Sequence, residues 1–165
     1  MSTLVIRAAQ VADVPALARL HVASWRETFR GQFADAVLDD PDAIGHREHY
    51  WTAALTDERY SKNTAATATI DSEIVGLAMS GPALDEDAAW ASQLYVLYTY
   101  ASVHGRGVGS ALLDAVIEPT APAGLWVVDP SPRAHAFYRK HGFEPDGRQR
   151  FDDGIRVIRM TRQLH

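Results

Sequence analysis

The sequence predicts an α/β fold with a mixed, mostly antiparallel central sheet flanked by helices. Three observations lead to this fold class. Short strand-like runs alternate with segments of helical periodicity, which is typical of α/β chains. Two turn sequences, Asp71-Ser72 and Asp152-Asp153-Gly154, each separate two strand-like runs and indicate hairpins. Residues 93–117 contain an apolar run, a glycine-rich stretch and an amphipathic segment, which indicates a strand, a tight loop and a helix.

The expected elements follow one another without a repeat, a linker or a low-complexity tract. The first helix is expected to begin after Asp13, a helix-capping residue type, with Pro15 in its first turn. Ser131 and Pro132 give a similar start for the last helix, and Gly142 gives its end. Strands are expected over residues 3–8, 64–71, 74–80, 89–100, 124–128, 143–151 and 155–162, and helices over 11–29, 40–55, 107–118 and 132–141.

Length and composition indicate one domain over residues 1–165 and exclude several function classes. The chain has 165 residues, 22% of them charged, and a net charge of -5 without a basic block, so nucleic acid is not an expected partner. The absence of cysteine excludes disulfides, thiolate metal sites and a cysteine acyl-enzyme. No apolar run is long enough to span a membrane, and no secretory signal is recognisable, so a cytoplasmic location without a membrane partner is expected.

The glycine-rich stretch predicts an anion site. It consists of His104, Gly105, Arg106, Gly107, Val108, Gly109 and Ser110. Helix N-termini present amides without intrahelical partners and the positive end of the helix dipole, which suits a phosphate. The spacing fits neither a Walker loop nor the G-x-G-x-x-G of a Rossmann fold, so nucleoside triphosphates and NAD are disfavoured. A strand-to-helix turn that needs glycine only for its geometry explains the isolated loop equally well.

Two motifs together resemble those of the GNAT acyltransferase superfamily. His104 to Gly109 are similar to the [Q/R]-x-x-G-x-[G/A] pyrophosphate loop of that family, with His104 at the Gln or Arg position. Residues 131–143 are similar to the second signature, N-x-x-A-x-x-F-Y-x-x-x-G-F, with Ser131 in place of Asn. The run from Ser24 to Gly31 looks like the first helix of many small bacterial members, so the resemblance extends over most of the chain.

The resemblance implies acetyl-CoA as the acyl donor and a direct transfer to an amine without a metal. It implies that the strands ending near Tyr100 and Val128 splay apart to form the acyl-CoA cleft. It places the pyrophosphate on residues 104–110 and the thioester on the backbone of Leu97, Tyr98 and Thr99, with Ser131 also near the cofactor. Tyr138 stands where relatives carry a tyrosine that protonates the leaving thiolate. A purely structural role for Tyr138, as a core aromatic, is the alternative.

The acceptor side is less specified. The resemblance implies that Trp25 and Phe29 line the acceptor pocket, with Tyr50 and Trp51 as further candidates that could equally be core residues. Gln93 stands where many relatives have a Glu that acts as general base, and an amide cannot take up the proton. The other candidates are surface acids or a water chain to solvent; the acids are Glu27, Asp85, Glu86 and Asp87. His46 and His49 have a spacing that can bind metal, but no third ligand is evident.

The leading functional interpretation is therefore an N-acetyltransferase that uses acetyl-CoA and a primary amine on a small molecule or peptide. A non-catalytic acyl-CoA-binding or sensor module with the same fold is the alternative, because Gln93 leaves the base unassigned. A structural domain without a cofactor is disfavoured by the two motifs. A homodimer is common among such domains, and the fold does not identify the acceptor.

Overall fold

The computed structural model describes residues 3–163, which fall into two compact units. Unit 1 comprises the chain up to Met79 together with Val96–Val116. Unit 2 comprises Ser80–Tyr95 and the chain from Ile117 onward. The prediction of a single domain over residues 1–165 stays a prediction.

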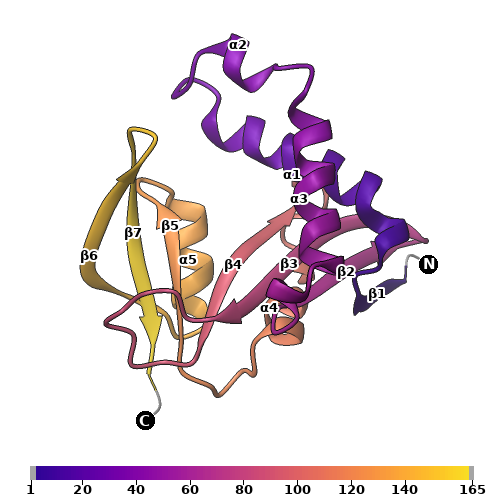
Figure 1. The fold of residues 1–165 in the computed structure, drawn as a ribbon. Coiled ribbons are helices and arrows are strands. Elements are labelled where there is room, and N and C mark those ends of the chain that lie inside the picture. Colours follow the sequence, from indigo (N-terminus) through magenta and orange to yellow (C-terminus); the bar gives the residue numbers. More distant parts are fainter. Residues whose placement is uncertain (1–2, 164–165) are drawn as a thin grey trace. The chain divides into compact units, whose positions relative to one another are not determined.

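Unit 1 holds the N-terminal part of the sheet (Figure 1). Strand β1 (Leu4–Ala8) pairs antiparallel with β2 (Thr64–Ile70), and β2 turns into β3 (Glu73–Pro82) through Asp71 and Ser72, whose φ angles are 52° and 69°. The last residues of β4 (Ser92–Thr99) continue this unit, and the amide of Tyr100, which follows β4, donates to the carbonyl of Val75. The predicted hairpin at Asp71 is confirmed.

The helices of unit 1 are α1 (Val14–Phe29), α2 (Asp35–Leu38), α3 (Ala43–Thr56) and α4 (Val108–Val116), with 3-10 turns η1 (Val11–Asp13), η2 (Glu58–Tyr60) and η3 (Ala101–Val103). Helices α1 and α3 pack side by side on one face of the strands, and α4 covers the opposite face against β1 and β2 (Figure 1). The core between them is apolar, and its fully enclosed side chains include Leu17, Leu20, Trp51, Leu77, Leu112 and Leu113.

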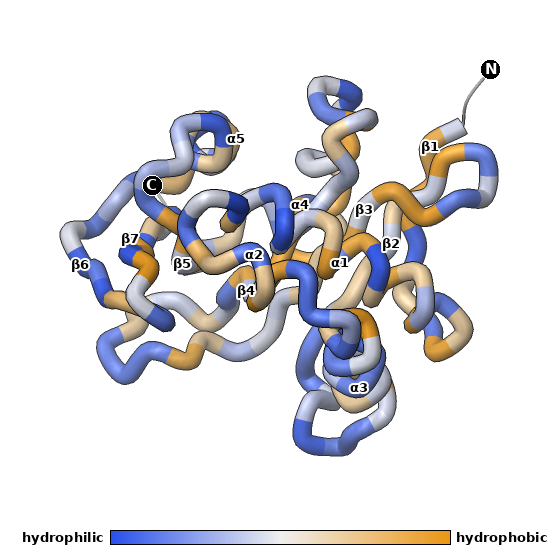
Figure 2. The backbone as a smooth tube through the Cα atoms, turned by 90° about the horizontal axis from the view of Figure 1, so that it is seen from above, coloured by the Kyte–Doolittle hydropathy of each residue, from blue (hydrophilic) through white to orange (hydrophobic). Residues whose placement is uncertain are grey.

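Unit 2 holds the C-terminal strands. The start of β4 pairs in parallel with β5 (Ala123–Val128), in a register that joins Ser92–Leu94 to Ala123–Leu125. Strand β7 (Ile155–Arg162) runs antiparallel to β5 and forms a hairpin with β6 (Glu144–Asp152), with positive φ angles at Asp153 and Gly154. The strand order is β1-β2-β3-β4-β5-β7-β6. Strand β6 is exposed along its length and largely hydrophilic (Figure 2).

Helix α5 (Pro132–Lys140) ends in a hydrogen-bonded C-cap, as the sequence predicts from Gly142. The amide of Gly142 donates to Arg139 and that of Phe143 donates to Tyr138, while Gly142 adopts φ 89°. This is the Schellman pattern, in which a glycine takes the left-handed conformation just beyond the helix. It directs Phe143 into the core of unit 2, where the side chain is fully enclosed and its ring packs edge-on against Tyr138.

The mixed α/β fold class with a mostly antiparallel seven-stranded sheet is confirmed. The predicted elements recur with small shifts at their ends, and α2 and the 3-10 turns are additions. Asp13 stands at the expected start of α1, but its carboxylate does not cap that helix. It accepts from the amide of Gln10 and from the guanidinium of Arg7 at 2.7 Å, and the Arg7 hydrogen bond lowers the pKa of Asp13.

Candidate functional site

The glycine loop in unit 1 has the conformation that its sequence predicts. Gly105 and Gly107 both have φ 79°, a left-handed conformation that side chains with a Cβ rarely adopt. A Cβ added at either glycine would meet no atom within 4 Å, so the requirement for glycine is conformational. Helix α4 starts directly after Gly107, whose carbonyl accepts the amide of Ala111. The surroundings of both glycines are therefore open, and the N-terminus of α4, the positive end of its dipole, follows them directly.

The amides of this loop are not equivalent. The amide of Arg106 donates to the carbonyl of Val103 at 3.3 Å, and that of His104 donates to Ala101. The amides of Arg106 and His104 therefore bond inside the loop. The amides of Val108 and Gly109 belong to the first turn of α4, where a regular helix provides no acceptor. An anion on this loop would bind to the first turn of α4.

Gly76 on β3 lets α4, which follows this loop, pack closely against the strands near the end of β4. A Cβ added at Gly76 would lie 2.7 Å from Leu112 Cδ1 and 3.2 Å from both Thr99 Cγ2 and Val108 Cγ1. The missing side chain therefore lets α4 approach the strands closely, and it brings Thr99 and Val108, two predicted cofactor residues, to one place. A glycine inside a strand is the available signal for such an approach, and the sequence reasoning did not use it.

The predicted acceptor residues of α1 form an aromatic group with a residue beyond the helix. The rings of Trp25 and Phe29 lie 6.3 Å and 5.3 Å from that of Phe33. Arg30 ties this region to α2 through ion pairs with Asp35 and Asp39. Trp25 and Phe29 are half-buried, so part of each ring remains reachable.

A second aromatic group of unit 1, which the sequence reasoning missed as a unit, surrounds His21. The indole of the buried Trp51 donates to His21 Nδ1 at 3.1 Å, and the rings of Tyr50 and Tyr98 lie 5.6 Å and 5.2 Å from the imidazole. Burial, with the nearby charge of Arg47, lowers the pKa of His21 to about 3. Burial raises the pKa of the Tyr98 hydroxyl. These residues lie 77 positions apart at the extremes, so only the fold brings them together.

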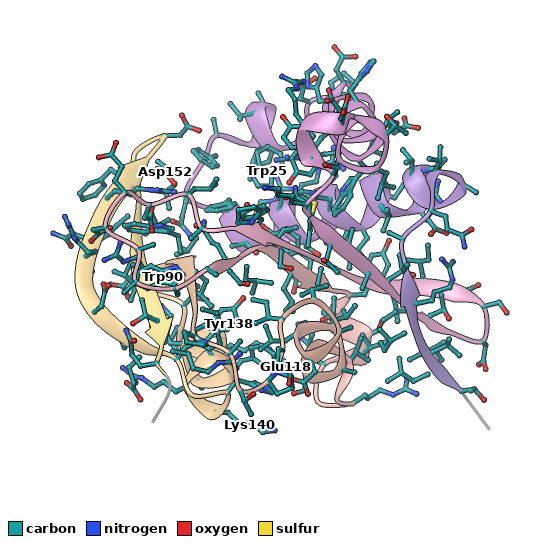
Figure 3. All side chains as sticks on the ribbon, turned by 60° about the horizontal axis from the view of Figure 1, so that its bottom comes forward. Trp25, Trp90, Glu118, Tyr138, Lys140 and Asp152 are labelled. Carbon is teal, nitrogen blue, oxygen red and sulfur yellow. The ribbon has the colours of Figure 1, made fainter. Side chains whose placement is uncertain are left out.

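In unit 2, Tyr138 is buried on the inner side of α5 (Figure 3). Its ring packs edge-on against Phe137 at 5.2 Å and Phe143 at 6.0 Å. The packing role considered for Tyr138 is therefore present, and it leaves the acid role as a prediction.

Ser131 stands at the N-cap position of α5, as expected, without a side-chain capping bond to the helix. It lines a surface pocket of about 560 Å³ together with the N-terminal turns of α5. His135 Nε2 lies 2.9 Å from the carbonyl of Val128 and ties α5 to the end of β5. On the same rim, Asp129 pairs with Arg156. Ser131 thus occupies an open position at the junction of β5 and α5.

Gln93 has a defined partner in unit 2. Its side chain is buried, and Oε1 accepts the amide of Leu84 at 3.0 Å. The amide group thereby fixes the segment that leads from β3 to β4. Gln93 was expected on the acceptor side of the site, and that assignment stays a prediction.

The acids before β4 form an ion-pair network around Arg159. The guanidinium of Arg159 binds Asp87 at 2.7 Å, Asp146 at 2.7 Å and Asp85 at 3.3 Å. Hydrogen bonds from Arg159 lower the pKa of Asp87, and the carboxylates in turn raise the pKa of Arg159. Asp85 also accepts from the indole of Trp126 at 3.1 Å. Carboxylates that are held this way are poor general bases at neutral pH.

No metal centre is evident in residues 3–163, where no group of three or more potential ligand side chains is arranged for an ion. His46 and His49 are exposed on α3. None of the helices in this described part of the chain is both long and apolar enough to cross a bilayer.

Comparison with known proteins agrees with the fold class. The family model described as "Acetyltransferase (GNAT) domain" matches residues 41–164. A probable N-acetyltransferase of Mycobacterium tuberculosis is 28% identical over 153 residues, which cover 89% of this chain and 83% of that protein. An uncharacterized N-acetyltransferase of Mycobacterium bovis is 32% identical over 156 residues, covering 92% and 85%.

Solved structures are similar along almost the whole chain. A crystal structure from Corynebacterium glutamicum, described as histone acetyltransferase HPA2 and related acetyltransferase, has a TM-score of 0.73 at 25% identity and covers 100% of this chain and 98% of that one. An N-acetyltransferase from Thermoplasma acidophilum in complex with coenzyme A has a TM-score of 0.70 at 17% identity, covering 95% and 98%.

Proposed function

Because the chain belongs to the GNAT acetyltransferase family and is an acetyltransferase, we propose that it transfers an acetyl group from acetyl-CoA to a primary amine by direct attack in a ternary complex. In this proposal the acceptor is a small molecule or peptide, and the reaction takes place in the cytoplasm. A single domain carries it out. No metal takes part in the proposed reaction.

The observation that carries the proposal is the glycine loop followed by α4. Left-handed glycines at 105 and 107 open the approach to the first turn of α4, where amides and the helix dipole favour a pyrophosphate. The position of Thr99 beside Val108 supports a cofactor that runs from this loop along the end of β4. The backbone of Leu97, Tyr98 and Thr99 would then stabilise the oxyanion.

The proposed chemistry needs little more than positioning. The neutral amine attacks the thioester carbon, and the carbon–sulfur bond breaks as the tetrahedral intermediate collapses. Tyr138 gives its hydroxyl proton to the departing thiolate and takes a proton back from water before the next turnover. We assign the proton that the amine loses to a water chain, because Gln93 cannot accept it and Asp85 and Asp87 are held by Arg159. Glu27 and Glu86, the other candidate bases, are exposed side chains and stay alternatives.

The test is calorimetric titration of CoA into Gly107→Leu. The leucine cannot keep φ 79° without strain, so the loop should rearrange and CoA affinity should fall at least tenfold. The matched control is Gly147→Leu on β6, because Gly147 has φ 93° and equally open surroundings. Both variants place a leucine at a positive φ, and only the first one lies in the proposed site.

Unchanged CoA affinity in a folded Gly107→Leu protein would remove the pyrophosphate from this loop. Absence of CoA binding in the wild-type protein would contradict the proposed function itself. A free-thiol assay with acetyl-CoA and a panel of primary amines then shows whether transfer follows binding.

A further inference from the structure

Arg47 on α3 is a cation that no carboxylate balances within residues 3–163. Its guanidinium lies over the ring of Tyr50, 5.4 Å from the centroid, and the residue is half-buried. Arg59 provides a contrast: it lies over Tyr60 at 5.3 Å, but it also binds Asp57 at 2.8 Å. Arg47 therefore retains its fork of N–H donors for a group from outside the described chain.

His21 supplies a second donor next to this cation. An indole nitrogen can only donate, so the bond from Trp51 to Nδ1 places the hydrogen of the neutral imidazole on Nε2. Nothing in residues 3–163 accepts from this Nε2–H group. The low pKa of His21 keeps the ring neutral over the physiological range, so it acts as a donor without adding charge.

Tyr98 supplies a third donor, from β4. Its ring lies 5.2 Å from His21, and its raised pKa keeps the hydroxyl protonated. No acceptor for this hydroxyl is found in the described part of the chain. Ring contacts link the three groups, because Arg47 lies over Tyr50 at 5.4 Å and the imidazole of His21 lies 5.6 Å from Tyr50 and 5.2 Å from Tyr98. Neither His21 Nε2 nor the Tyr98 hydroxyl is fully enclosed, since among residues 3–163 only Trp90 Nε1 is an enclosed side-chain polar atom without a partner.

We propose that His21, Arg47 and Tyr98 bind a carboxylate of the amine acceptor, an inference that rests on the proposed acetyl transfer. The three side chains offer N–H and O–H donors and one positive charge, and the ring of the fully buried Trp51 lies 6.0 Å from the imidazole, so one side of this group is shielded from water, where polar contacts are stronger. A carboxylate carries one negative charge and accepts a guanidinium in bidentate fashion. A phosphate dianion would leave excess negative charge against a single Arg.

The acceptor class follows from the position of these groups. Tyr98 belongs to the stretch of β4 whose backbone is proposed to contact the thioester, so a bound carboxylate would hold an amine a few bonds away from the acetyl group. Arg47 would repel an acceptor that carries only ammonium groups. Amino acids and related amines with a nearby carboxylate therefore fit this site, and polyamines do not.

Three primary amines with the same spacing test the proposal in the free-thiol assay: β-alanine, β-alaninamide and 3-aminopropanol. The wild-type kcat/KM should be at least tenfold higher for β-alanine than for the two analogues that lack the carboxylate. Arg47→Gln should remove this preference, chiefly through KM, and Arg47→Lys should keep part of it. Arg59→Gln is the matched control and should leave the preference intact.

A second measurement does not depend on turnover. Titration of β-alanine into the protein should shift the NMR signal of His21 Nε2 and raise the pKa of His21, and Arg47→Gln should abolish both changes. Equal use of all three amines, or an unmoved His21 signal, overturns the carboxylate assignment while CoA binding and acetyl transfer stand. A preference for 2-aminoethyl phosphate over β-alanine also overturns it, in favour of a phosphate site. Loss of CoA binding in the wild-type protein would instead contradict the proposed function.

Discussion

Tyr138 has two roles to distinguish, packing and proton donation. Replacement by Phe keeps the ring against Phe137 and Phe143 and removes only the hydroxyl. If the hydroxyl protonates the thiolate, kcat should fall roughly ten- to a thousandfold, and the high-pH limb of the rate profile should change. Melting temperature and CoA affinity serve as controls and should stay close to those of the wild type. A wild-type rate for Tyr138→Phe would leave this residue with packing alone.

His21 makes the stability of unit 1 sensitive to acid. An unfolded histidine takes up a proton near pH 6.5, whereas His21 in the fold resists protonation down to about pH 3. Above about pH 7 the imidazole is neutral in both the folded and the unfolded protein, so its burial costs no proton. As the pH falls below 6.5, the unfolded protein takes up a proton that the folded protein does not, and the free energy of unfolding decreases. Linkage gives a loss of about 2 kcal/mol at pH 5.

The measurement is urea unfolding of the wild type and of His21→Gln at pH 7 and pH 5. Glutamine keeps an acceptor for Trp51 but does not titrate, so the variant should lose less stability between the two pH values than the wild type. An identical pH dependence in both proteins would show that the imidazole titrates normally.

At the scale of single residues, the sequence indicates candidate site residues only where they belong to a local motif. Tyr138, Gly107 and Ser131 could be proposed because their neighbours carry the pattern, and their roles stay predictions. His21 and Arg47 were missed because their partners come from three separate elements, and a histidine on a helix gives no signal of its own. The role of Asp85 and Asp87 was open for the same reason, since Arg159 lies more than 70 residues away.

At the scale of elements, Arg159 joins the segment before β4 to β6 and β7. Replacement by Met would leave the three carboxylates without their shared cation. We expect the free energy of unfolding at pH 7 to fall by roughly 1–3 kcal/mol, less than for a fully buried pair, because Asp87 and Asp146 remain partly reachable by water. Arg148→Met is the control, since the Arg148 side chain is largely exposed and, among the described residues, pairs with Asp87.

Acid separates this role from simple packing. The pKa of Asp87 is lowered in the fold, so the contribution of the network is present above about pH 4 and is lost as the pH falls further. Chemical unfolding at pH 7 and pH 3 should show that the free energy of unfolding of Arg159→Met changes less between the two pH values than that of the wild type. Equal losses at both pH values would indicate that Arg159 acts through packing on Trp90 and Trp126.

The sequence predicted which segments form helices and strands better than it predicted where those helices and strands begin and end. Hairpin turns, the proline at the start of α5 and the glycine after it are local signals, and each was confirmed. Helix α2 has only four residues and gives too short a pattern for periodicity to detect. Its place depends on Arg26, which donates from α1 to the carbonyl of Leu38, and on Arg30, both of which are tertiary contacts.

At the scale of the whole molecule, the fold class was predictable because two motifs and the strand pattern agree with one another. The division into two compact units was not. Strands β3 and β4 each contribute residues to both units, and no change of composition marks those positions. The acceptor also lies beyond sequence patterns, since it depends on side chains that the fold gathers from distant segments.

The order of binding and release is a property of the whole molecule and gives the last prediction. A ping-pong route needs a protein nucleophile that carries the acetyl group between the two substrates, and the 165-residue sequence contains no cysteine. Acetyl-CoA and the amine must then be bound together, so initial rates at varied concentrations of both should give intersecting double-reciprocal lines. Dead-end inhibition by CoA should likewise depend on both substrates. Parallel lines, or an acetylated enzyme that forms and decays as fast as turnover in rapid-quench mass spectrometry, would require a histidine, serine or lysine carrier and would replace direct attack with a two-step transfer.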